Sequence, residues 1–327
     1  MSKNKIAVIG GGSAGIMAAL RCVLNNDQCL LFPGTGKDKK RSRAFWVSKV
    51  ENIPGFAHYK KGIEEPNKET LKWIENSPFK ENLHLFKNTS ISSLKKEGNV
   101  FFLEDNKGKI HEADYVILCT GVMDVQPQIG GKIEPVFPYA NAQIIDYCLR
   151  CDGHHTINKN VSIIGHDSGA AWVAIMLKER YNCPEMSILT NGKDSEFSED
   201  TQKLINKYNI KVSSGELVEI IGDTKCSPPL LEGFKLEDGT IHETNFAFVS
   251  LGMIVYNKLA LDCGAAVDKR GFILTNSKGE SNISNLYVAG DLRAGSKKQI
   301  YTGWDHAVDS ADDINMKIRS NKRLTIS

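Results

Sequence analysis

Two cysteines separated by two residues are the pair in this sequence whose types and spacing most directly indicate chemistry. Cys148 and Cys151 lie in the stretch YCLRCDGHH (147–155), where Asp152 follows the second cysteine. Cysteines at this spacing at the start of a helix can close a small disulfide ring, and backbone N–H groups there lower the thiol pKa from ~8.5 to roughly 3.5–7.5. An adjacent carboxyl whose pKa is raised by partial burial can supply the proton that a leaving thiolate needs. The stretch is consistent with dithiol–disulfide exchange, in which Asp152 would by its position supply the proton.

Two other interpretations of the cysteine pair stay open at this point. Cys148 and Cys151 with His154 and His155 offer four zinc-type ligands, although a zinc knuckle places its second pair about 12 or more residues after the first. Alternatively, the two thiols are unreactive. A haem attachment motif needs a histidine directly after the second cysteine, where this chain has Asp152. The remaining cysteines lie singly in apolar or loop settings and are interpreted as core or inert thiols, and no metal site is predicted.

The bulk composition narrows the class of protein. The chain has 327 residues, which is enough for two domains with cores of their own, and its net charge of +2 argues against nucleic-acid binding. No run of 18 apolar residues predicts a transmembrane helix. The first residues, MSKNKIAVIG, lead straight into an apolar strand rather than a signal peptide. We therefore expect a cytoplasmic protein, in a compartment that normally keeps thiols reduced.

The first element that would position a cofactor is a glycine-marked strand, turn and helix. In KIAVIGGGSAGIMAAL (5–20), an apolar strand precedes Gly10, Gly12 and Gly15, which have the spacing of a dinucleotide-binding turn. These glycines let the turn close, let backbone amides approach a pyrophosphate and let the helix pack on the strand. The N-terminus of the helix favours the anion.

A second segment of the same design begins at residue 160. In NVSIIGHDSGAAWVAIMLKERY (160–181), an apolar strand runs into Gly165 and His166, but Asp167 occupies the position of the middle glycine. A carboxylate placed where the backbone must meet a diphosphate repels it. The sequence therefore predicts the strand and the helix but not a working phosphate cradle.

The segments that follow each opening also correspond. A hairpin with an acidic-glycine turn and then an apolar strand ending in glycine occur at residues 99–121 and again at 232–252. A last strand at 284–289 and an amphipathic helix complete the chain after the second half. The chain therefore consists of two related nucleotide-binding halves, of which the second is inserted into the first.

Six landmarks in order carry a resemblance to a known family. They are Gly10–Gly15, VENIPGF (50–56), CTG (119–121), CLRCDG (148–153), VSLG (249–252) and VAGD…KQ (288–299). Over essentially its whole length the chain resembles the low-molecular-weight thioredoxin reductases, flavoproteins with two dinucleotide-binding folds. The resemblance implies an α/β fold with two Rossmann-like three-layer domains: an FAD-binding domain (1–123 and 252–327) and a redox-disulfide domain (124–251) inserted in it. It also implies a homodimer, and a rotation between domains that brings the cysteines first to the flavin and then to a partner.

The same resemblance implies roles for individual residues. Contacts with FAD are implied for Gly10, Gly12, Ser13, Ala14, Gly15, Asn52, Thr120, Gly121, Gly290, Asp291, Gln299 and Ile300. Cys151 would face the flavin, Cys148 would exchange with the partner, and Asp152 would move the proton.

Three departures from the family pattern bear on the electron donor. Phe32 and Pro33 stand where an acid would hold the adenosine ribose. The stretch MSILTNGKDSEF (186–197) has no arginine for a 2′-phosphate, and losing two charge-assisted hydrogen bonds costs about 3–6 kcal/mol, or two to four decades of affinity. The histidines at 154 and 155 and the aromatic ring of Trp304 replace apolar and small residues.

Together with Asp167, these departures point to family branches that do not use NAD(P)H. One branch takes electrons from ferredoxin. Another binds a second FAD in place of the nicotinamide nucleotide, here at Gly165, His166, Asp167 and Trp304, and oxidises dithiols. We predict an FAD-dependent dithiol–disulfide oxidoreductase with one or two FAD per chain and a thioredoxin-like protein, a small dithiol or ferredoxin as partner. An NADPH-dependent thioredoxin reductase with an altered 2′-phosphate site and a non-catalytic flavin redox sensor remain the alternatives.

Overall fold

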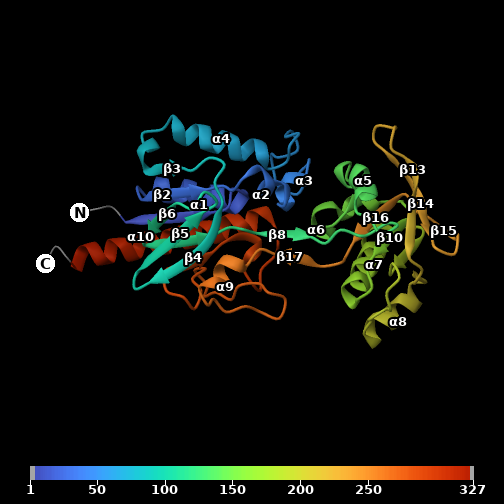
Figure 1. Cartoon of the computed structure of the whole chain (residues 1–327). Helices are drawn as coiled ribbons and strands as arrows, with labels where there is room; N and C mark the ends of the chain where they lie inside the picture. Colours follow the sequence, from blue (N-terminus) through green and yellow to red (C-terminus); the bar gives the residue numbers. More distant parts are fainter. Residues whose placement is uncertain (1–3, 325–327) are drawn as a thin grey trace. The chain divides into compact units, whose positions relative to one another are not determined.

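The computed structural model describes residues 4–324 and divides the chain into two compact units (Figure 1). Within the described range, unit 1 contains the residues up to Trp46, Tyr59–Met123 and those from Ile254 on, and unit 2 contains Val47–His58 and Asp124–Met253. The sequence assigned all of 1–123 to the first domain, whereas Val47–His58 packs with unit 2. The Ser48 hydroxyl, for example, donates to Gln143 Oε1 at 3.2 Å.

Unit 1 is built on a parallel five-stranded sheet in the order β18-β7-β1-β2-β3. The strands are β18 (Leu286–Val288), β7 (Tyr115–Leu118), β1 (Lys5–Ile9), β2 (Gln28–Phe32) and β3 (Leu83–Leu85). Side chains alternate between two cores: Ile6 and Val8 face one side of the sheet, and Ala7 and Ile9 the other. Because both faces are covered, β1 and β7 are nearly continuous apolar runs.

Helices cover one face of this sheet and a small antiparallel sheet covers the other. The helical layer is α1 (Ser13–Leu24), α4 (Glu64–Glu75) and α10 (Ile300–Leu324). The antiparallel sheet is β4 (Ile91–Glu97), β5 (Val100–Asp105) and β6 (Ile110–Ala113). Shorter elements of the unit are α2 (Gly36–Lys40), α3 (Arg43–Trp46), η1 (Lys80–Asn82), α9 (Lys258–Asp262) and η4 (Gly290–Leu292).

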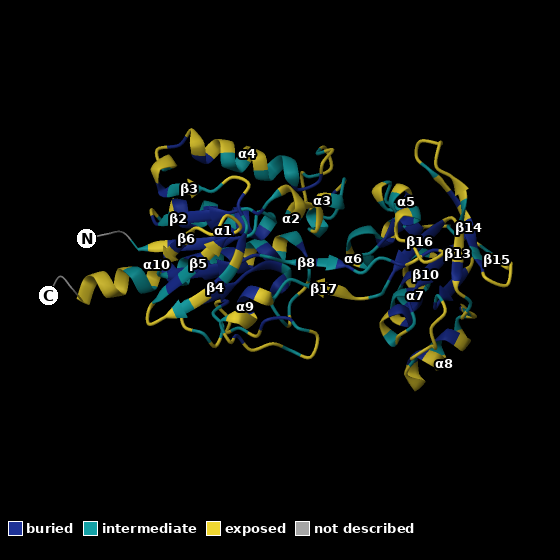
Figure 2. Ribbon diagram, viewed as in Figure 1, coloured by how far each residue is buried: buried dark blue, intermediate teal, exposed yellow. Residues whose placement is uncertain are grey.

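Unit 2 repeats the same three layers. Its parallel sheet has the order β12-β11-β10-β16-β9, formed by Lys211–Ser213, Met186–Leu189, Val161–Ile164, Phe246–Val249 and Ile145–Asp146. Helices α7 (Ser168–Tyr181) and α8 (Glu199–Lys207) lie on one face, and the antiparallel sheet β13 (Leu217–Asp223), β14 (Leu230–Leu236) and β15 (Ile241–Glu243) lies on the other. Figure 2 shows β10 and β16 buried between these layers. The predicted α/β fold with two Rossmann-like three-layer units is confirmed.

Short elements complete unit 2 and the passages of the chain between the units. They are η2 (Glu134–Val136), α5 (Phe137–Asn141), α6 (Leu149–Asp152) and η3 (Gly153–Thr156), together with the paired strands β8 (Val122–Asp124) and β17 (Met253–Val255). Across residues 4–324, no helix is both long enough and apolar enough to cross a membrane.

Candidate active site

The cysteine pair of the sequence motif forms a disulfide at the start of α6. Cys148 is the residue that caps this helix, and it is bonded to Cys151 with a Cα–Cα distance of 5.3 Å, within the usual range for a disulfide. The backbone N–H of Cys151 lies 3.2 Å from Cys148 Sγ. Both cysteines are partly exposed, so a thiolate formed at Cys148 has a backbone donor and access to solvent. The structure thus favours the redox interpretation over the zinc-site and inert-thiol interpretations.

A group of ionisable side chains adjoins the disulfide within unit 2. A carboxylate oxygen of Asp152 lies within 4.8 Å of both sulfurs. A carboxylate oxygen of the same residue lies within 4.8 Å of one ring nitrogen of His155 and of a carboxylate oxygen of Asp146. His155 is therefore separated from the disulfide by one carboxyl group. The sequence predicted Asp152 as the proton donor beside the cysteines, and that role stays a prediction.

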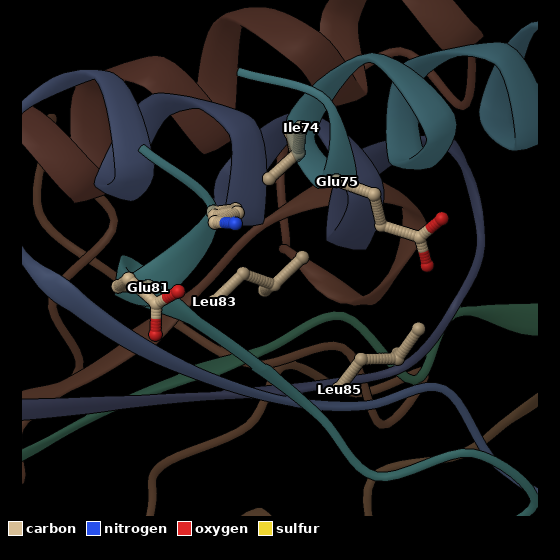
Figure 3. A pocket seen from close by; sticks show the side chains of 6 residues that line it. Ile74, Glu75, Glu81, Leu83 and Leu85 are labelled. Carbon is tan, nitrogen blue, oxygen red and sulfur yellow. The ribbon is translucent and has the colours of Figure 1, made fainter. Parts of the chain in front are cut away.

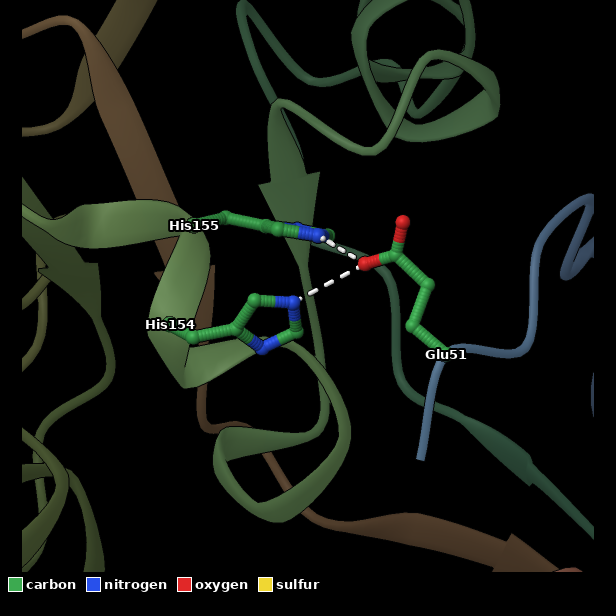
Figure 4. Close-up of side chains that lie close together, drawn as sticks. All are labelled: Glu51, His154 and His155. Carbon is green, nitrogen blue, oxygen red and sulfur yellow. Dashed lines mark hydrogen bonds and ion pairs between the residues drawn. The ribbon is translucent and has the colours of Figure 1, made fainter. Parts of the chain in front are cut away.

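His155 lies between the carboxylates of Asp146 and Glu51, and Figure 4 shows its contact with Glu51. Its Nε2 is 2.8 Å from Glu51 Oε2 and its Nδ1 is 3.4 Å from Asp146 Oδ2, while His154 Nε2 lies 2.9 Å from the same Glu51 oxygen. Hydrogen bonds to Asp146 and then to Glu51 raise the pKa of His155 to about 9, although its partial burial opposes this. The two histidines in turn lower the pKa of Glu51. We therefore assign His155 as an imidazolium at neutral pH.

Sequence reasoning identified the two histidines only as a departure from a family pattern and did not connect them with Glu51. More than 100 positions separate Glu51 from His154 and His155 (103 and 104). One feature of the sequence could have indicated such a partner, namely the two adjacent histidines after the redox motif. A partly buried histidine ring needs a hydrogen-bond partner.

The first glycine turn, at the N-terminus of α1, is open. Gly10 has a φ of 121°, and a Cβ there would lie 2.2 Å from the Cys119 carbonyl oxygen, so this position requires glycine. A Cβ on Gly15 would lie 1.9 Å from Gly10 O. At Gly12, in contrast, no described atom lies within 4 Å of such a Cβ, and no described side chain caps the helix. Backbone N–H groups at this end of α1 therefore remain available to an anion.

Of the other residues predicted to contact FAD, Gly290 lies against this turn and most of the rest belong to unit 1. A Cβ on Gly290 would lie 2.9 Å from the Cβ of Ala14, next to Ser13 in the turn, which brings η4 against α1. Asp291 follows in η4, where Arg43 Nη1 lies 3.6 Å from its carboxylate. The predicted residues at the start of α10 and after β7 belong to the same unit, namely Gln299, Ile300, Thr120 and Gly121. Asn52 belongs to unit 2.

Two buried nitrogens without a hydrogen-bond partner in the described part of the chain lie near η4, on Arg293 and His306. Among the described residues, the buried side-chain nitrogens without a hydrogen-bond partner are His166 Nδ1, Arg293 Nη1 and His306 Nδ1. His306 is 7% exposed, and burial lowers its pKa, so its ring is neutral. An open anion site and two unpaired nitrogens in one unit are the features expected where a polar cofactor binds. The residues present therefore fit FAD.

The second glycine turn, at the N-terminus of α7, is closed. The carboxylate of Asp167 caps this helix by accepting from the N–H of Ala170 at 3.0 Å. The loop after β11 also lies against the turn, because the N–H of Glu196 donates to His166 O at 2.7 Å and the N–H of Ser198 to Ser168 Oγ at 2.7 Å. The predicted second nucleotide site divides between the units, with Gly165, His166 and Asp167 in unit 2 and Trp304 in unit 1.

Cysteines outside the motif are not placed for exchange. Cys22, Cys29, Cys119 and Cys183 are buried, Cys263 is half-buried and Cys226 is exposed. Burial raises the pKa of Cys119 and Cys183, and it raises that of Cys263 to about 11. A hydrogen bond to Asp223 raises the pKa of Cys226. These four groups are thus thiols rather than thiolates at neutral pH.

A separate pocket of about 260 Å³ opens between the end of α4 and β3 (Figure 3). Its lining residues are Ile74, Glu75, Lys80, Glu81, Leu83 and Leu85. None of the predicted site residues is among them, so this pocket is not the candidate active site.

Comparisons with known proteins agree with this geometry. Residues 4–311 match the family described as pyridine nucleotide-disulphide oxidoreductase. The chain is 24% identical over 303 residues to the thioredoxin reductase of Treponema pallidum, covering 91% of each chain, and 27% identical over 323 residues to that of Mycoplasma genitalium, covering 97% of this chain and 94% of the other. Its fold is similar to the crystal structure of a putative thioredoxin reductase from Bacillus anthracis (TM-score 0.81, 19% identity, 98% of this chain and 100% of the other). The chain belongs to the pyridine nucleotide-disulphide oxidoreductase family, as a thioredoxin reductase-like flavoprotein oxidoreductase that acts on sulfur groups.

Proposed function

We propose that this protein moves electron pairs between a bound FAD, the Cys148–Cys151 disulfide and a thiol or disulfide partner, without a nicotinamide nucleotide. Opening the disulfide takes up two electrons and two protons, and closing it releases them. FAD supplies the reversible storage of an electron pair. The observation that carries the proposal is the carboxylate of Asp167, which occupies the helix end where the nucleotide diphosphate would bind.

The first unit offers residues for the flavin. The backbone of Gly10, Gly12, Ser13, Ala14 and Gly15 would hold the diphosphate at the uncapped start of α1. Asp291 would bind the ribityl chain, and Gln299 and Ile300 would approach the ring system from the start of α10. Asn52, Thr120, Gly121 and Gly290 complete the proposed set.

The cysteines carry out the exchange by attack and release. With the pair reduced, the Cys148 thiolate attacks one sulfur of a partner disulfide, which forms a mixed disulfide and releases a partner thiolate. The Cys151 thiolate then attacks Cys148 Sγ, which restores the bond between the two cysteines and releases the second partner thiolate. Asp152, whose carboxylate lies within 4.8 Å of both sulfurs, supplies protons to the leaving thiolates.

The second unit disfavours a diphosphate of either kind. Asp167 takes a backbone donor of α7 and adds a negative charge, and Asp194 and Glu196 in the adjacent loop add two more against Lys193. These charges act equally on NAD(P)H and on a second FAD. We therefore propose one flavin per chain, in preference to the two-flavin alternative.

The partner is proposed to be a thioredoxin-like protein. The relatives from Treponema pallidum and Mycoplasma genitalium carry the name thioredoxin reductase, and the chain covers 91% and 94% of their lengths. A small dithiol or ferredoxin is the alternative partner. The cytoplasmic location and the homodimer stay predictions. Light scattering of the purified protein tests the oligomeric state.

Anaerobic reduction of the FAD-loaded protein tests the proposal. We expect reduced thioredoxin or dithiothreitol to bleach the flavin absorbance in wild type but not in Cys148→Ser, and micromolar NADPH or NADH to leave it unchanged over seconds. Full bleaching by NADPH within seconds would instead identify an NADPH-dependent thioredoxin reductase. Exchange activity that survives in Cys148→Ser would support a redox sensor. Heat release of the cofactor gives the flavin count per chain.

A further inference from the structure

Beyond the exchange chemistry, on which this inference rests, we propose that His155, held between Asp146 and Glu51, reloads Asp152 with protons during disulfide exchange. Cys148 and Cys151 attack as thiolates and have by then released their two protons to water. Reduction of one partner disulfide then produces two partner thiolates, each of which takes one proton. Asp152 carries one proton at a time, so it must be protonated again within a single exchange cycle. A protonated base next to Asp152 and open to water meets that need.

The geometry places His155 at this position. One ring nitrogen of His155 lies within 4.8 Å of a carboxylate oxygen of Asp152 and of one of Asp146, and a carboxylate oxygen of Asp152 lies within 4.8 Å of both cysteine sulfurs. The side chain of His155 is 21% exposed and that of Glu51 36%, so one end of the group reaches solvent. The sulfurs, Asp152, His155 and Glu51 thus form a continuous series from the disulfide to water.

The charges around His155 keep it protonated. The ionisable groups that face it are Asp146 from β9, Glu51 from the segment 47–58, Asp152 from α6 and the neighbouring His154, while Lys159 acts on Asp146. From β16, the uncharged ring of Phe246 lies edge-on to the His155 ring, with the ring centroids 6.1 Å apart. With its pKa raised to about 9, His155 carries a proton at neutral pH and loses it as the pH rises through about 9.

Glu51, His154 and His155 could also ligate a metal ion. The distances between their atoms distinguish a metal site from a hydrogen-bonded group. Both histidine Nε2 atoms lie 2.8–2.9 Å from one oxygen of Glu51. Two ligands of a tetrahedral zinc ion, each about 2.0–2.1 Å from the metal, lie roughly 3.3 Å apart. The shorter separations match direct N–H···O hydrogen bonds, in which each ring donates to the carboxylate. The distances are therefore those of a hydrogen-bonded group rather than of a metal site.

The proton transfers run from water through His155 to Asp152, and from there to the two partner thiolates. Asp152 in its acid form gives its proton to the first partner thiolate and becomes a carboxylate. The imidazolium of His155 transfers its Nδ1 or Nε2 proton to Asp152 and becomes neutral. Asp152 then protonates the second partner thiolate, and water restores the proton on His155. His155 does not react with the sulfurs itself and acts on them only by supplying protons to Asp152.

The test compares two partner disulfides that differ in their need for a proton. Dithiothreitol-reduced, desalted protein reacts anaerobically in a single turnover with hydroxyethyl disulfide, whose aliphatic thiolates must be protonated, or with dithiobis(nitrobenzoate), whose aromatic thiolates need no proton. We expect His155→Gln to slow the aliphatic reaction about tenfold and the aromatic one less than twofold. His242→Gln, which changes a unit 2 histidine on β15, serves as the matched control and should leave both rates unchanged.

A pH profile separates proton supply from a merely structural effect. In wild type, the aliphatic rate should fall as the pH rises through about 9, where His155 loses its proton. In Glu51→Gln the fall should move to lower pH, because one of the two carboxylates that hold the imidazolium becomes neutral, while the aromatic rate keeps the wild-type profile.

Other outcomes would overturn the inference. If His155→Gln slows both disulfides equally, the residue is structural; a stoichiometric metal ion that leaves with chelator and is lost in His155→Gln would show a metal site instead. If wild type reduces neither disulfide, the failure belongs to the proposed exchange function rather than to His155.

Discussion

The start of α1 and the start of α7 share one design and differ in how the helix end is used. Both follow a buried parallel strand, both begin with a glycine held tightly against a neighbouring strand end, and both helices pack on their sheet. At Gly12 the helix end is open, whereas at Asp167 a carboxylate caps it. The Asp167 carboxylate is thus the difference between a helix end that favours an anion and one that disfavours it.

The two helix ends thus differ locally although the fold around them is repeated. The Asp167 cap stabilises α7 without a ligand, whereas the open N–H groups of α1 gain their partners only when an anion binds. The acidic loop after β11, which hydrogen-bonds to the second turn through Glu196, reinforces the contrast. Variants that add a carboxylate to the first turn or remove the charge from the second test this comparison directly.

The largest expected effect comes from placing a carboxylate in the first turn. In Gly12→Asp, a charge about 4 Å from the flavin diphosphate costs about 4 kcal/mol at an effective dielectric of 20, or roughly a thousandfold in FAD affinity. Fluorescence titration of the apoprotein with FAD measures this. Gly12→Asn, which has the same shape without the charge, should lose far less. Equal losses in the two variants would show that size rather than charge matters.

Gly15→Ala should reduce stability next most strongly. Its Cβ would lie 1.9 Å from the backbone oxygen of Gly10, so the turn must open, at a cost of about 3 kcal/mol in the free energy of unfolding. Urea denaturation of the apoprotein measures it. Gly12→Ala, where no described atom lies within 4 Å of the new Cβ, should stay within about 1 kcal/mol of wild type. A stable Gly15→Ala protein would contradict this geometry.

Removing the negative charge from the second turn should raise the affinity for a nucleotide, and by less than the first variant lowers the affinity for FAD. Asp167→Asn keeps a side-chain oxygen for the Ala170 N–H but removes the charge, which near solvent is worth about 1 kcal/mol against a diphosphate, or about fivefold in affinity. Equilibrium dialysis with NADPH and NADH gives the dissociation constants. Weaker binding by Asp167→Asn than by wild type would show that the carboxylate is not what disfavours the nucleotide.

The smallest effect concerns the cap itself. Asp167→Ala removes the acceptor of the Ala170 N–H and should lower the free energy of unfolding by about 1 kcal/mol. Ser198→Ala removes the corresponding cap of α8, where the serine hydroxyl accepts from Thr201 N at 3.3 Å, and should cost a similar amount. Thermal unfolding followed by circular dichroism compares the two, and a loss confined to Ser198→Ala would contradict the assigned role of Asp167.

The sequence predicted the features that depend on neighbouring residues. The spacing of Gly10, Gly12 and Gly15 and the apolar strands before each turn indicated both parallel sheets, because glycine sterics and strand burial act over a few positions. The disulfide was likewise indicated by a motif of four residues. The structure confirms the fold from these local signals.

The sequence did not reveal features that depend on distant contacts. The packing of Val47–His58 with unit 2 depends on hydrogen bonds to residues about a hundred positions away, such as Ser48 to Gln143 and Glu51 to His155. The loop contact between Glu196 and His166 has no composition signal, because it joins two backbone groups. Such pairings follow from the folded topology and not from residue spacing.

The burial of Cys22, Cys29, Cys119 and Cys183 has a consequence for the fidelity of the chemistry. A chain that handles oxidising equivalents risks scrambling, in which a stray sulfur captures the mixed disulfide and locks the partner in place. Here four of the other sulfurs are buried, and the pKa of the exposed Cys226 is raised by its hydrogen bond to Asp223, which favours resolution of a mixed disulfide by Cys151.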